Sequence, residues 1–467
     1  MKKNDIGVIG MAVMGRNLAL NIAKSGYNVA IFNRTINKTK DVMLKCSEKN
    51  ISPYFLIQDF LRSLKKPRRI LLMVQSGQAT DDIINVLTPY LNSGDIIIDG
   101  GNSFYKDTIR RSKDLLKNNV SFLGVGISGG EYGALNGPSI MPGGQKSAYD
   151  IVKPIFKSIA SKFKNQPCVA YIGPNGSGHY VKMVHNGIEY ADMQLISEVY
   201  IILKNIVNYS NKEISDVFDI WNQGELNSYL IDITKNILRK KDHNGDLIDY
   251  VLDEAVNKGT GKWTCQDALD LHESLNVITE SVFARYVSSL KSQRMLASKI
   301  LSGPNVSLVS SHKDDFIEDL RKALYLSKII AYSQGFSQLG SASKKYYWNL
   351  KCHEIASIFR SGCIIQADFL NQLVEIYKYD NIIINLLLSP YFQDISKQYQ
   401  SSLRKIVSYV VKQGIAIPAL VSSLTYYDSY RTSQSSANLI QAQRDCFGAH
   451  TYKRNDKSGV YHTNWLE

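Results

Sequence analysis

Residues 181–190 have the spacing in this chain that is best suited to chemistry. If this segment is a helix, an amine, an imidazole, an amide and a carboxyl group share one face, at Lys182, His185, Asn186 and Glu189. The opposite face is aliphatic with the same period, which predicts burial against other helices. A solvent-exposed helix with a Lys/Glu pair is the simpler interpretation, but it predicts more charge and fewer Val, Ile and Met nearby. A polar row on a buried helix is costly without a polar occupant in front of it, so we predict an active site there.

The start of the chain predicts a turn that binds a dinucleotide. Residues 6–9 have an apolar strand pattern, and a helical pattern begins near residue 17. Between the two lies a Gly-x-Ala-x-x-Gly sequence, made of Gly10, Met11, Ala12, Val13, Met14 and Gly15. In such a turn the first glycine allows a tight bend, the small central residue lets the backbone approach a pyrophosphate, and the last glycine lets the helix pack on the strand. The amides at the start of the helix then face the phosphates.

The residues that follow the second predicted strand, 28–32, indicate which dinucleotide binds. NAD-binding enzymes usually have an acidic residue here for the ribose hydroxyls, whereas this chain has Asn33, Arg34 and Thr35. Arg34 can bind a 2′-phosphate through two parallel hydrogen bonds, and its neighbours can add others. A plain turn is the alternative interpretation, but the position after the second strand favours NADP.

Further strand patterns at residues 70–74, 95–99 and 120–125 alternate with helical patterns, which is typical of a doubly wound parallel sheet. Ligands of such sheets bind beyond the carboxyl ends of the strands. Small and amide residues with open backbone N–H groups stand at these ends: Gln75, Ser76, Gly77, Gly100, Gly101, Asn102, Ser128, Gly129 and Gly130. We expect residues 131–144 to form an ordered loop and residues 169–172 a short strand.

Apolar residues recur at helical spacing from residue 179 to about residue 425. We therefore predict three parts: a Rossmann-like α/β domain at 1–177, a large all-helical domain at 178–430, and a polar C-terminal tail at 431–467. The tail cannot build a core of its own, so we expect it to lie on another surface or to be disordered. His462 and Trp465, near its end, favour order.

Two cationic positions in the predicted helical domain point to an anionic ligand. Lys258 opens a Gly-rich stretch, residues 258–264, that suits a phosphate but is not a Walker A loop. Arg285 lies on an otherwise apolar helix and needs an anionic partner. A structural ion pair with a nearby Glu is the alternative for Arg285 and is about equally consistent with the sequence.

Composition limits the class of protein. The 467 residues are 44% hydrophobic and 21% charged, which is typical of a globular protein with a core large enough to need no disulfide or metal. The net charge of +13 suits anionic partners. The densest basic run, residues 65–69, precedes a strand pattern and has no nucleic-acid-binding signature around it. The six cysteines lack metal-ligand spacing, and no apolar run is long enough for a signal peptide or a membrane span, so we expect a cytoplasmic protein.

Taken together, these motifs resemble the decarboxylating 6-phosphogluconate dehydrogenase family over essentially the full length of the chain. The resemblance is carried, in family order, by residues 10–15 with 33–35, 99–102, 126–130, 181–190, 258–264 and 444–450. It implies oxidation of 6-phosphogluconate by NADP to ribulose 5-phosphate and CO2, a step of the pentose phosphate pathway, without a metal. It also implies a homodimer, because in this family the tail enters the partner subunit's site.

The resemblance also implies roles for individual residues. Lys182 resembles the general base and Glu189 the general acid. Contacts with the sugar acid are implied for Asn102, Ser128, Gly129, Gly130, His185, Asn186 and Tyr190. Contacts with the phosphate are implied for Lys258 and Arg285, and contacts with the partner subunit's substrate for Arg444 and His450. Contacts with the cofactor are implied for Val74, Gln75, Ser76 and Asn102.

Two departures from the family pattern concern the cofactor. Gln75 stands where many members have Lys, and the cofactor-contacting C-terminal extension of longer members is not expected after Trp465. Two other functions remain open. A related 3-hydroxyacid dehydrogenase would not decarboxylate, but it is typically shorter and needs no phosphate-binding cations. A non-catalytic NADPH-binding protein would be expected to have lost Lys182 or Glu189.

Overall fold

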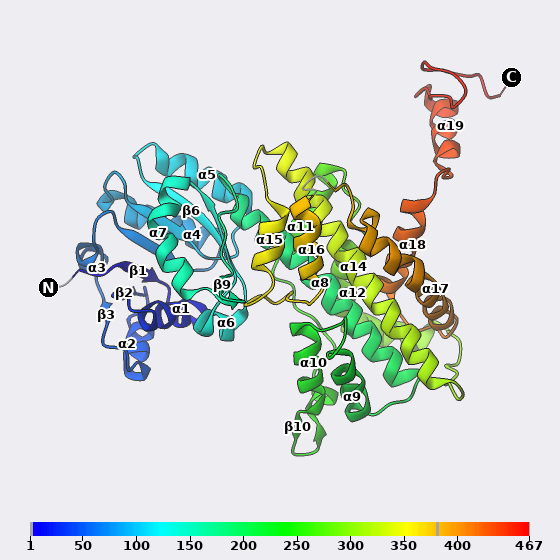
Figure 1. The fold of residues 1–467 in the computed structure, drawn as a ribbon, viewed down its shortest axis with the longest axis horizontal. Helices are drawn as coiled ribbons and strands as arrows, with labels where there is room; N and C mark the ends of the chain where they lie inside the picture. The colour runs from blue at the N-terminus through cyan, green and yellow to red at the C-terminus, as the bar shows by residue number, and fades with distance from the viewer. Residues whose placement is uncertain (1–2, 380–382, 467) are drawn as a thin grey trace.

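The computed structural model describes residues 3–379 and 383–466, and its N-terminal part is built on a seven-stranded sheet (Figure 1). The strands are β1 (Ile6–Ile9), β2 (Val29–Phe32), β3 (Ile51–Tyr54), β4 (Arg69–Leu72), β5 (Ile96–Asp99), β6 (Ser121–Ile127) and β7 (Ile140–Gly144). Their order is β3-β2-β1-β4-β5-β6-β7, and all neighbours pair in parallel except β6 and β7. This order confirms the predicted doubly wound α/β class.

Helices cover both faces of the sheet. They are α1 (Val13–Lys24), α2 (Ile36–Lys45), α3 (Ile57–Ser63), α4 (Gln78–Leu87), α5 (Tyr105–Leu116), α6 (Gly130–Asn136) and α7 (Lys146–Ile159). Successive residues of β1 point to opposite faces: Val8 packs in one apolar core with Leu18 and Phe156, and Ile9 in another with Phe60. The sheet is therefore anchored on both sides, and its strand ends are held in fixed positions.

The expectation of a loop at residues 131–144 is wrong. These residues contain most of α6 and all of β7, which pairs with β6 over its full length. Pro142, Gly143 and Gly144 make β7 read as a loop in the sequence. An edge strand tolerates proline and glycine because one of its sides needs no partner.

The expected strand at residues 169–172 is also absent. Val169 makes an isolated bridge with Ile140, and Ile172 donates its backbone N–H to the oxygen of Pro142 at 2.8 Å, but no strand extends along this segment. The sequence did not predict β3, in which Pro53 interrupts a short edge strand. Both errors concern edges of the sheet, where hydrophobic alternation is weakest.

The C-terminal part is helical. Its helices are α8 (Ser177–Asn205), α9 (Asn211–Trp221), α10 (Tyr229–Arg239), α11 (Thr260–Leu271), α12 (Asn276–Ser288), α13 (Lys291–Ile300), α14 (Lys313–Lys345), α15 (Cys352–Ile358), α16 (Leu370–Tyr379), α17 (Pro390–Lys412), α18 (Pro418–Arg431) and α19 (Ala437–Gly448). The only strand pairings recorded in this part are a small hairpin, β10 (Lys241–Asp242) with β11 (Gly245–Asp246), and single bridges. In the described ranges, none of the helices has the length and apolar character to cross a membrane.

Helix α8 joins the two parts. Its first turn lies against β6 and β7, and its remaining turns pack among α11, α12 and α14. Glycines make this approach possible. A Cβ on Gly178 would lie 2.3 Å from the backbone oxygens of Gly124 and Met141, and one on Gly126 would lie 2.5 Å from the Cβ of Lys182. The sheet therefore sets the position of Lys182 through backbone contact.

We expect Gly178→Ala to destabilise the protein by about 1–3 kcal/mol, because the new methyl group overlaps backbone atoms that cannot move aside alone. The matched control is Gly340→Ala, in the interior of α14, where a Cβ would meet no atom within 4 Å. That change is expected to stabilise the protein by about 0.5–1 kcal/mol through helix propensity. Urea unfolding of both variants measures the difference, and equal stabilities would contradict the proposed close contact.

Candidate active site

α8 brings the polar groups of its inner face into one cluster. The side chains of Lys182 and His185 are 6% and 0% exposed. The Nζ of Lys182 lies 3.3 Å from Nδ1 of His185, and Oε2 of Glu189 lies 3.7 Å from the same nitrogen. An amine, an imidazole and a carboxyl group are thus contiguous, with the first two buried and the Glu189 side chain 24% exposed.

His185 has a neutral ring with a defined tautomer. Burial, assisted by the neighbouring Lys182 amine, lowers the pKa of His185 well below its ordinary value. Nδ1 lies 2.9 Å from Oδ1 of Asn186, an acceptor, which places the ring proton on Nδ1. The orientation of the Asn186 amide is in turn fixed by the hydrogen bond that its Nδ2 donates to Thr260 at 3.2 Å. Nε2 is left to accept hydrogen bonds.

Two donors converge on that nitrogen. Oγ of Ser128 lies 3.0 Å from Nε2 of His185, and Sγ of Cys363 lies 2.9 Å from it. The hydroxyl of Ser128 also accepts the backbone N–H of Ile364 at 3.3 Å. The strand end at Ser128 and the connection between α15 and α16 therefore meet at the imidazole.

Burial acts in opposite directions on the two proton-transfer candidates. It lowers the pKa of the Lys182 amine, which the Glu189 carboxylate partly offsets. It raises the pKa of Glu189, which the cations Lys182, Arg285 and Lys258 partly offset. The same environment therefore favours a neutral amine and a protonated carboxyl group on one helix face.

A pair of cationic residues, Arg285 and Lys258, lies at the Glu189 end of this row and is called the cationic corner below. The guanidinium of Arg285 stacks on Tyr190, with its Cζ 3.5 Å from the ring centroid. The Tyr190 hydroxyl donates to Oδ1 of Asn257 at 3.1 Å, which orients the residue before the exposed Lys258. In the described part of the chain no carboxylate lies within 4.0 Å of the Arg285 guanidinium, so the alternative of a structural ion pair is not realised.

The remaining residues implied at the sugar end stand at strand exits. Ser128 is buried, whereas Gly129 and Gly130 are half-buried at the start of α6 with φ of +106° and +60°. A Cβ on Gly129 would lie 2.7 Å from the backbone oxygen of Gly362, so the two chain segments touch through backbone atoms. Asn102 is exposed after β5.

Sequence reasoning missed Gly362, Cys363 and Ile364. They reach the site from the helical part, far along the chain from Ser128, and carry no periodic signal. The glycine between two helical patterns was the one local sign of a special backbone position, and Gly362 does have a φ of +66°.

The turn between β1 and α1 has the shape that a pyrophosphate requires. A Cβ on Gly10 would lie 2.4 Å from the oxygen of Met73, and one on Gly15 would lie 1.8 Å from the oxygen of Gly10. Met11 donates its backbone N–H to Oδ1 of Asn33 at 2.9 Å, which joins this turn to the end of β2. The residues fit a dinucleotide, because the two glycines let the backbone of this turn pack closely at the amino end of α1, where its N–H groups can face a phosphate.

Arg34 and Thr35 follow on the surface beside this cradle, and both side chains are exposed. In the ranges that the structure describes, Arg34 has no carboxylate within ion-pair distance. Val74 and Ser76 are half-buried after β4, and Gln75 is exposed. Met11 and Gly15 are buried, Met14 is half-buried, and Ala12 and Val13 are exposed at the start of α1.

Arg444 and His450 lie away from this cluster. Arg444 belongs to α19 and His450 stands two residues after its end, in a segment that projects from the helical body beyond α18 (Figure 1). The tail is ordered around Asp445, whose carboxylate is fully buried and accepts the Nε1–H of Trp465 at 2.8 Å and the backbone N–H of Thr463 at 3.0 Å. In their own chain, therefore, the two residues do not face Lys182.

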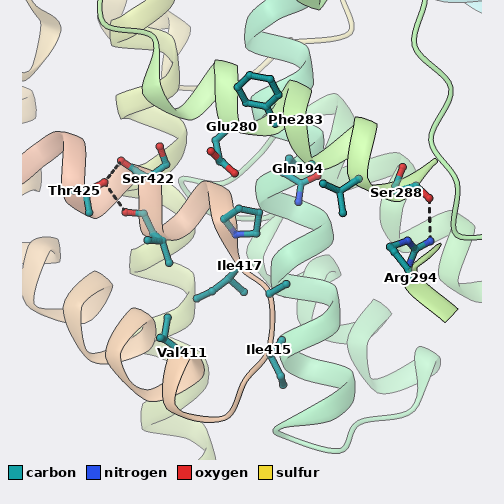
Figure 2. Close-up of a pocket in the computed structure, with 15 residues that line it drawn as sticks. Gln194, Glu280, Phe283, Ser288, Arg294, Val411, Ile415, Ile417, Ser422 and Thr425 are labelled. Carbon is teal, nitrogen blue, oxygen red and sulfur yellow. Dashed lines mark hydrogen bonds between the residues drawn. The ribbon is translucent and has the colours of Figure 1, made fainter. Parts of the chain in front are cut away.

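A cavity of about 800 Å³ opens next to the cationic corner, between α8, α12 and α18 (Figure 2). Phe283 and Ile417 give it apolar walls, and Gln194 and Glu280 add polar groups. Part of its lining lies on α12, the helix that carries Arg285, but none of the polar row of α8 lines it.

Comparison with known proteins places these features in a family. Residues 5–173 match the model described as the NAD binding domain of 6-phosphogluconate dehydrogenase, and residues 178–465 match that of its C-terminal domain. The chain is 63% identical over 469 residues to the decarboxylating 6-phosphogluconate dehydrogenase of Buchnera aphidicola subsp. Schizaphis graminum, covering 100% of this chain and 99% of the relative. It is 58% identical to that of Escherichia coli strain K12, with 100% of each chain covered.

A solved structure gives the same result. The 6-phosphogluconate dehydrogenase of Plasmodium falciparum, described in apo form and in complexes with NADP+ and with 6-phosphogluconate, is 45% identical. It superposes with a TM-score of 0.95 and covers 99% of this chain and 100% of its own. The backbone cradle, the polar row and the cationic corner thus lie within a fold and a sequence shared along the whole chain, and the chain belongs to the 6-phosphogluconate dehydrogenase family.

Proposed function

We propose that this protein oxidises 6-phosphogluconate with NADP and decarboxylates the product to ribulose 5-phosphate and CO2. The observation that carries the proposal is the single helix face on which burial favours a neutral Lys182 and a protonated Glu189. A base and an acid of this kind are what an oxidation followed by protonation needs. The cationic corner at Lys258 and Arg285 supplies the charge that a phosphate at the other end of the substrate requires.

Lys182 is the general base for the oxidation. The C3 hydroxyl must lose its proton as the carbonyl forms, so a base must lie within hydrogen-bonding reach. An ordinary Lys has a pKa of about 10.4 and would be protonated at neutral pH. Burial lowers the pKa of Lys182, and the phosphate charge is met largely by Lys258 and Arg285, which leaves the amine free to accept a proton. NADP, when bound, takes up the hydride.

Glu189 is the general acid for the final step. The 3-keto acid loses CO2 because its carbonyl accepts the electrons of the breaking bond, and the protonated Lys182 amine stabilises the developing enolate oxygen. The resulting enediol needs a proton at C1. Glu189 stands about two turns along the same helix face, and burial raises its pKa, which favours the protonated form that this step needs.

The sugar acid is held between the strand exits and α8. Asn102, Ser128, Gly129 and Gly130 offer amide, hydroxyl and backbone donors on one side, and His185, Asn186 and Tyr190 offer side chains on the other. The neutral His185 ring, with its proton on Nδ1, keeps the site from gaining another positive charge beside Lys182. That supports its role as a positioning and binding group.

The cofactor is held by the cradle at residues 10–15, by Val74 and Ser76 after β4, and by Asn102. Arg34 binds the 2′-phosphate, supported by Asn33 and Thr35. Because Gln75 carries no charge, Arg34 must supply most of the attraction for this phosphate, and NADP selectivity depends on one guanidinium.

The active unit is a cytoplasmic homodimer in which the tail of one protomer completes the site of the other. Arg444 and His450 do not face their own Lys182, and α19 exposes Leu439, Ile440 and Phe447. Such apolar side chains are suited to a protein surface and not to water. The cavity between α8, α12 and α18 offers a partly apolar surface (Figure 2).

The purified protein is expected to reduce NADP with 6-phosphogluconate and to release one equivalent of CO2 per NADPH. Absorbance of NADPH and trapping of CO2 measure the two products in the same assay. NADPH without CO2 would indicate a simple hydroxyacid dehydrogenase, and NADPH binding without turnover would indicate a binding protein. The variant Arg34→Ala is expected to raise the KM for NADP by about 10–100-fold and leave that for NAD nearly unchanged, because it removes one charged hydrogen-bonding group.

We expect Lys182→Met to lower kcat by about 10²–10⁴-fold through loss of the general base. In the wild type, activity falls as the pH drops through the pKa of Lys182, since the protonated amine cannot accept the C3 proton. That acidic limb should vanish in the variant. The exposed Lys212 provides the control Lys212→Met, with an unchanged profile. An acidic limb that survives in Lys182→Met together with near-normal activity rules out this role.

Mixing two inactive variants tests the exchanged tail. In a heterodimer of Lys182→Met and Arg444→Ala, an exchanged tail gives one site both an intact Lys182 and an intact Arg444. Random reassociation is then expected to restore about a quarter of the wild-type activity, because half the dimers are mixed and each has one complete site. If each tail served its own protomer, mixing the variants would restore nothing.

A further inference from the structure

A buried ion pair lies directly behind the proposed general acid. Asp192 stands three residues after Glu189 on α8 and is 1% exposed. Its Oδ1 lies 2.5 Å from Nζ of Lys328 on α14, which is 0% exposed. Neither residue has a part in the reaction proposed above.

Stability alone does not explain such a pair. Removing two charges from water costs several kcal/mol per ion, and replacement by apolar residues of similar volume is often neutral or stabilising. Much of the surrounding contact between α8 and α14 is aliphatic, with Val184, Ile188, Ile329 and Ile330 in one apolar core. An apolar pair would therefore fit here.

The ion pair affects Glu189 more than Lys182. The Asp192 carboxylate, one helical turn from Glu189, contributes to raising the pKa of Glu189. The carboxylate that raises the pKa of Lys182 is instead that of Glu189. Lys328 faces Asp192 from α14. Its positive charge therefore opposes the effect of the Asp192 carboxylate on the pKa of Glu189.

We propose that Asp192 and Lys328 are positioning residues that set the local charge around Glu189, so that it keeps its proton until the enediol forms. The inference rests on the proposed role of Glu189 as general acid. Asp192 repels a negative charge on Glu189, and Lys328 limits that repulsion and holds Asp192 in place. The balance between the two charges fixes the pH above which the acid is lost.

Other charged or titratable groups face Glu189 from each packed element. They are Lys182 and His185 on α8, Lys258 before α11, Arg285 on α12, Tyr332 on α14 and Cys363 after α15. Tyr332 follows Lys328 by one turn and donates its hydroxyl to the oxygen of Ile365 at 2.7 Å. Burial is the main cause that raises the pKa of Glu189, the cations in this set lower it, and the Asp192 carboxylate acts in the same direction as burial.

Variants that remove one charge of the pair test this balance. The quantity measured is the alkaline limb of the pH profile of kcat, where activity falls because Glu189 loses its proton. Asp192→Asn leaves Lys328 unopposed and should move that limb to lower pH by on the order of one unit. Lys328→Met leaves Asp192 unopposed and should move it to higher pH. The acidic limb, which reports Lys182, should stay in place in both. A merely structural pair predicts weaker folding in both variants and no opposite shifts.

The double variant Asp192→Asn/Lys328→Met leaves no unpaired charge, so it should fold even if a single variant does not, with its alkaline limb between those of the single variants. Asp95→Asn is the matched control, because it breaks another buried ion pair, with Arg68 at 2.6 Å, far from the site. It should lower the melting temperature and leave both limbs unchanged.

Deuterium uptake at C1 of ribulose 5-phosphate gives an independent readout of the acid step, and its pH dependence should shift with the same signs. The inference is overturned if the alkaline limb shifts in the same direction in both single variants. It is also overturned if the alkaline limb of the double variant lies outside the range between those of the single variants. Failure of the wild type to turn over 6-phosphogluconate would instead refute the proposed function, so the two failures are distinguishable.

Discussion

The contact between the first turn of α8 and the edge of the sheet is the constraint on which the rest of the structure depends. Backbone atoms of Gly178 pack against those of Gly124, Met141 and Gly143 with no side chain between them. Because α8 starts this close to the strand exits, its next turns lie directly in front of them. The proposed base and the proposed cofactor cradle are thus fixed to one rigid sheet, and relative positions accurate enough for hydride transfer follow from packing.

Burial of that helix also supplies the chemistry. Removal from water disfavours the charged form of any group, so it lowers the pKa of an amine and raises that of a carboxyl group. In Lys182 and Glu189 one physical cause therefore acts in the direction that the proposed base and the proposed acid both require. Because each is brought toward its neutral form, the two do not need to form an ion pair. The cations proposed to meet the substrate's phosphate, Arg285 on α12 and Lys258 before α11, lie on other elements, so proton transfer and phosphate binding are assigned to different parts of the fold.

The sequence predicted the parts that depend on local pattern. The polar row of α8, the glycines of the first turn and the parallel order of the central strands each follow from spacing within about ten residues. It failed at β3 and β7, where edge positions tolerate proline and glycine and the hydrophobic alternation is lost. It also missed Cys363, because no local pattern reports its contact with a residue as distant in the chain as His185.

The C-terminal tail shows how a polar segment without an apolar core of its own can be ordered. Its composition gave no core, and only His462 and Trp465 favoured order; in the structure a single buried carboxylate, Asp445, is surrounded by hydrogen bonds from Thr451, His462, Thr463 and Trp465. A segment organised in this way keeps its shape without a surface to lie on. Under the proposed exchange between protomers, it would reach the partner already folded. Assembly would then carry little ordering cost, and most of the apolar surface buried on α19 would contribute to affinity.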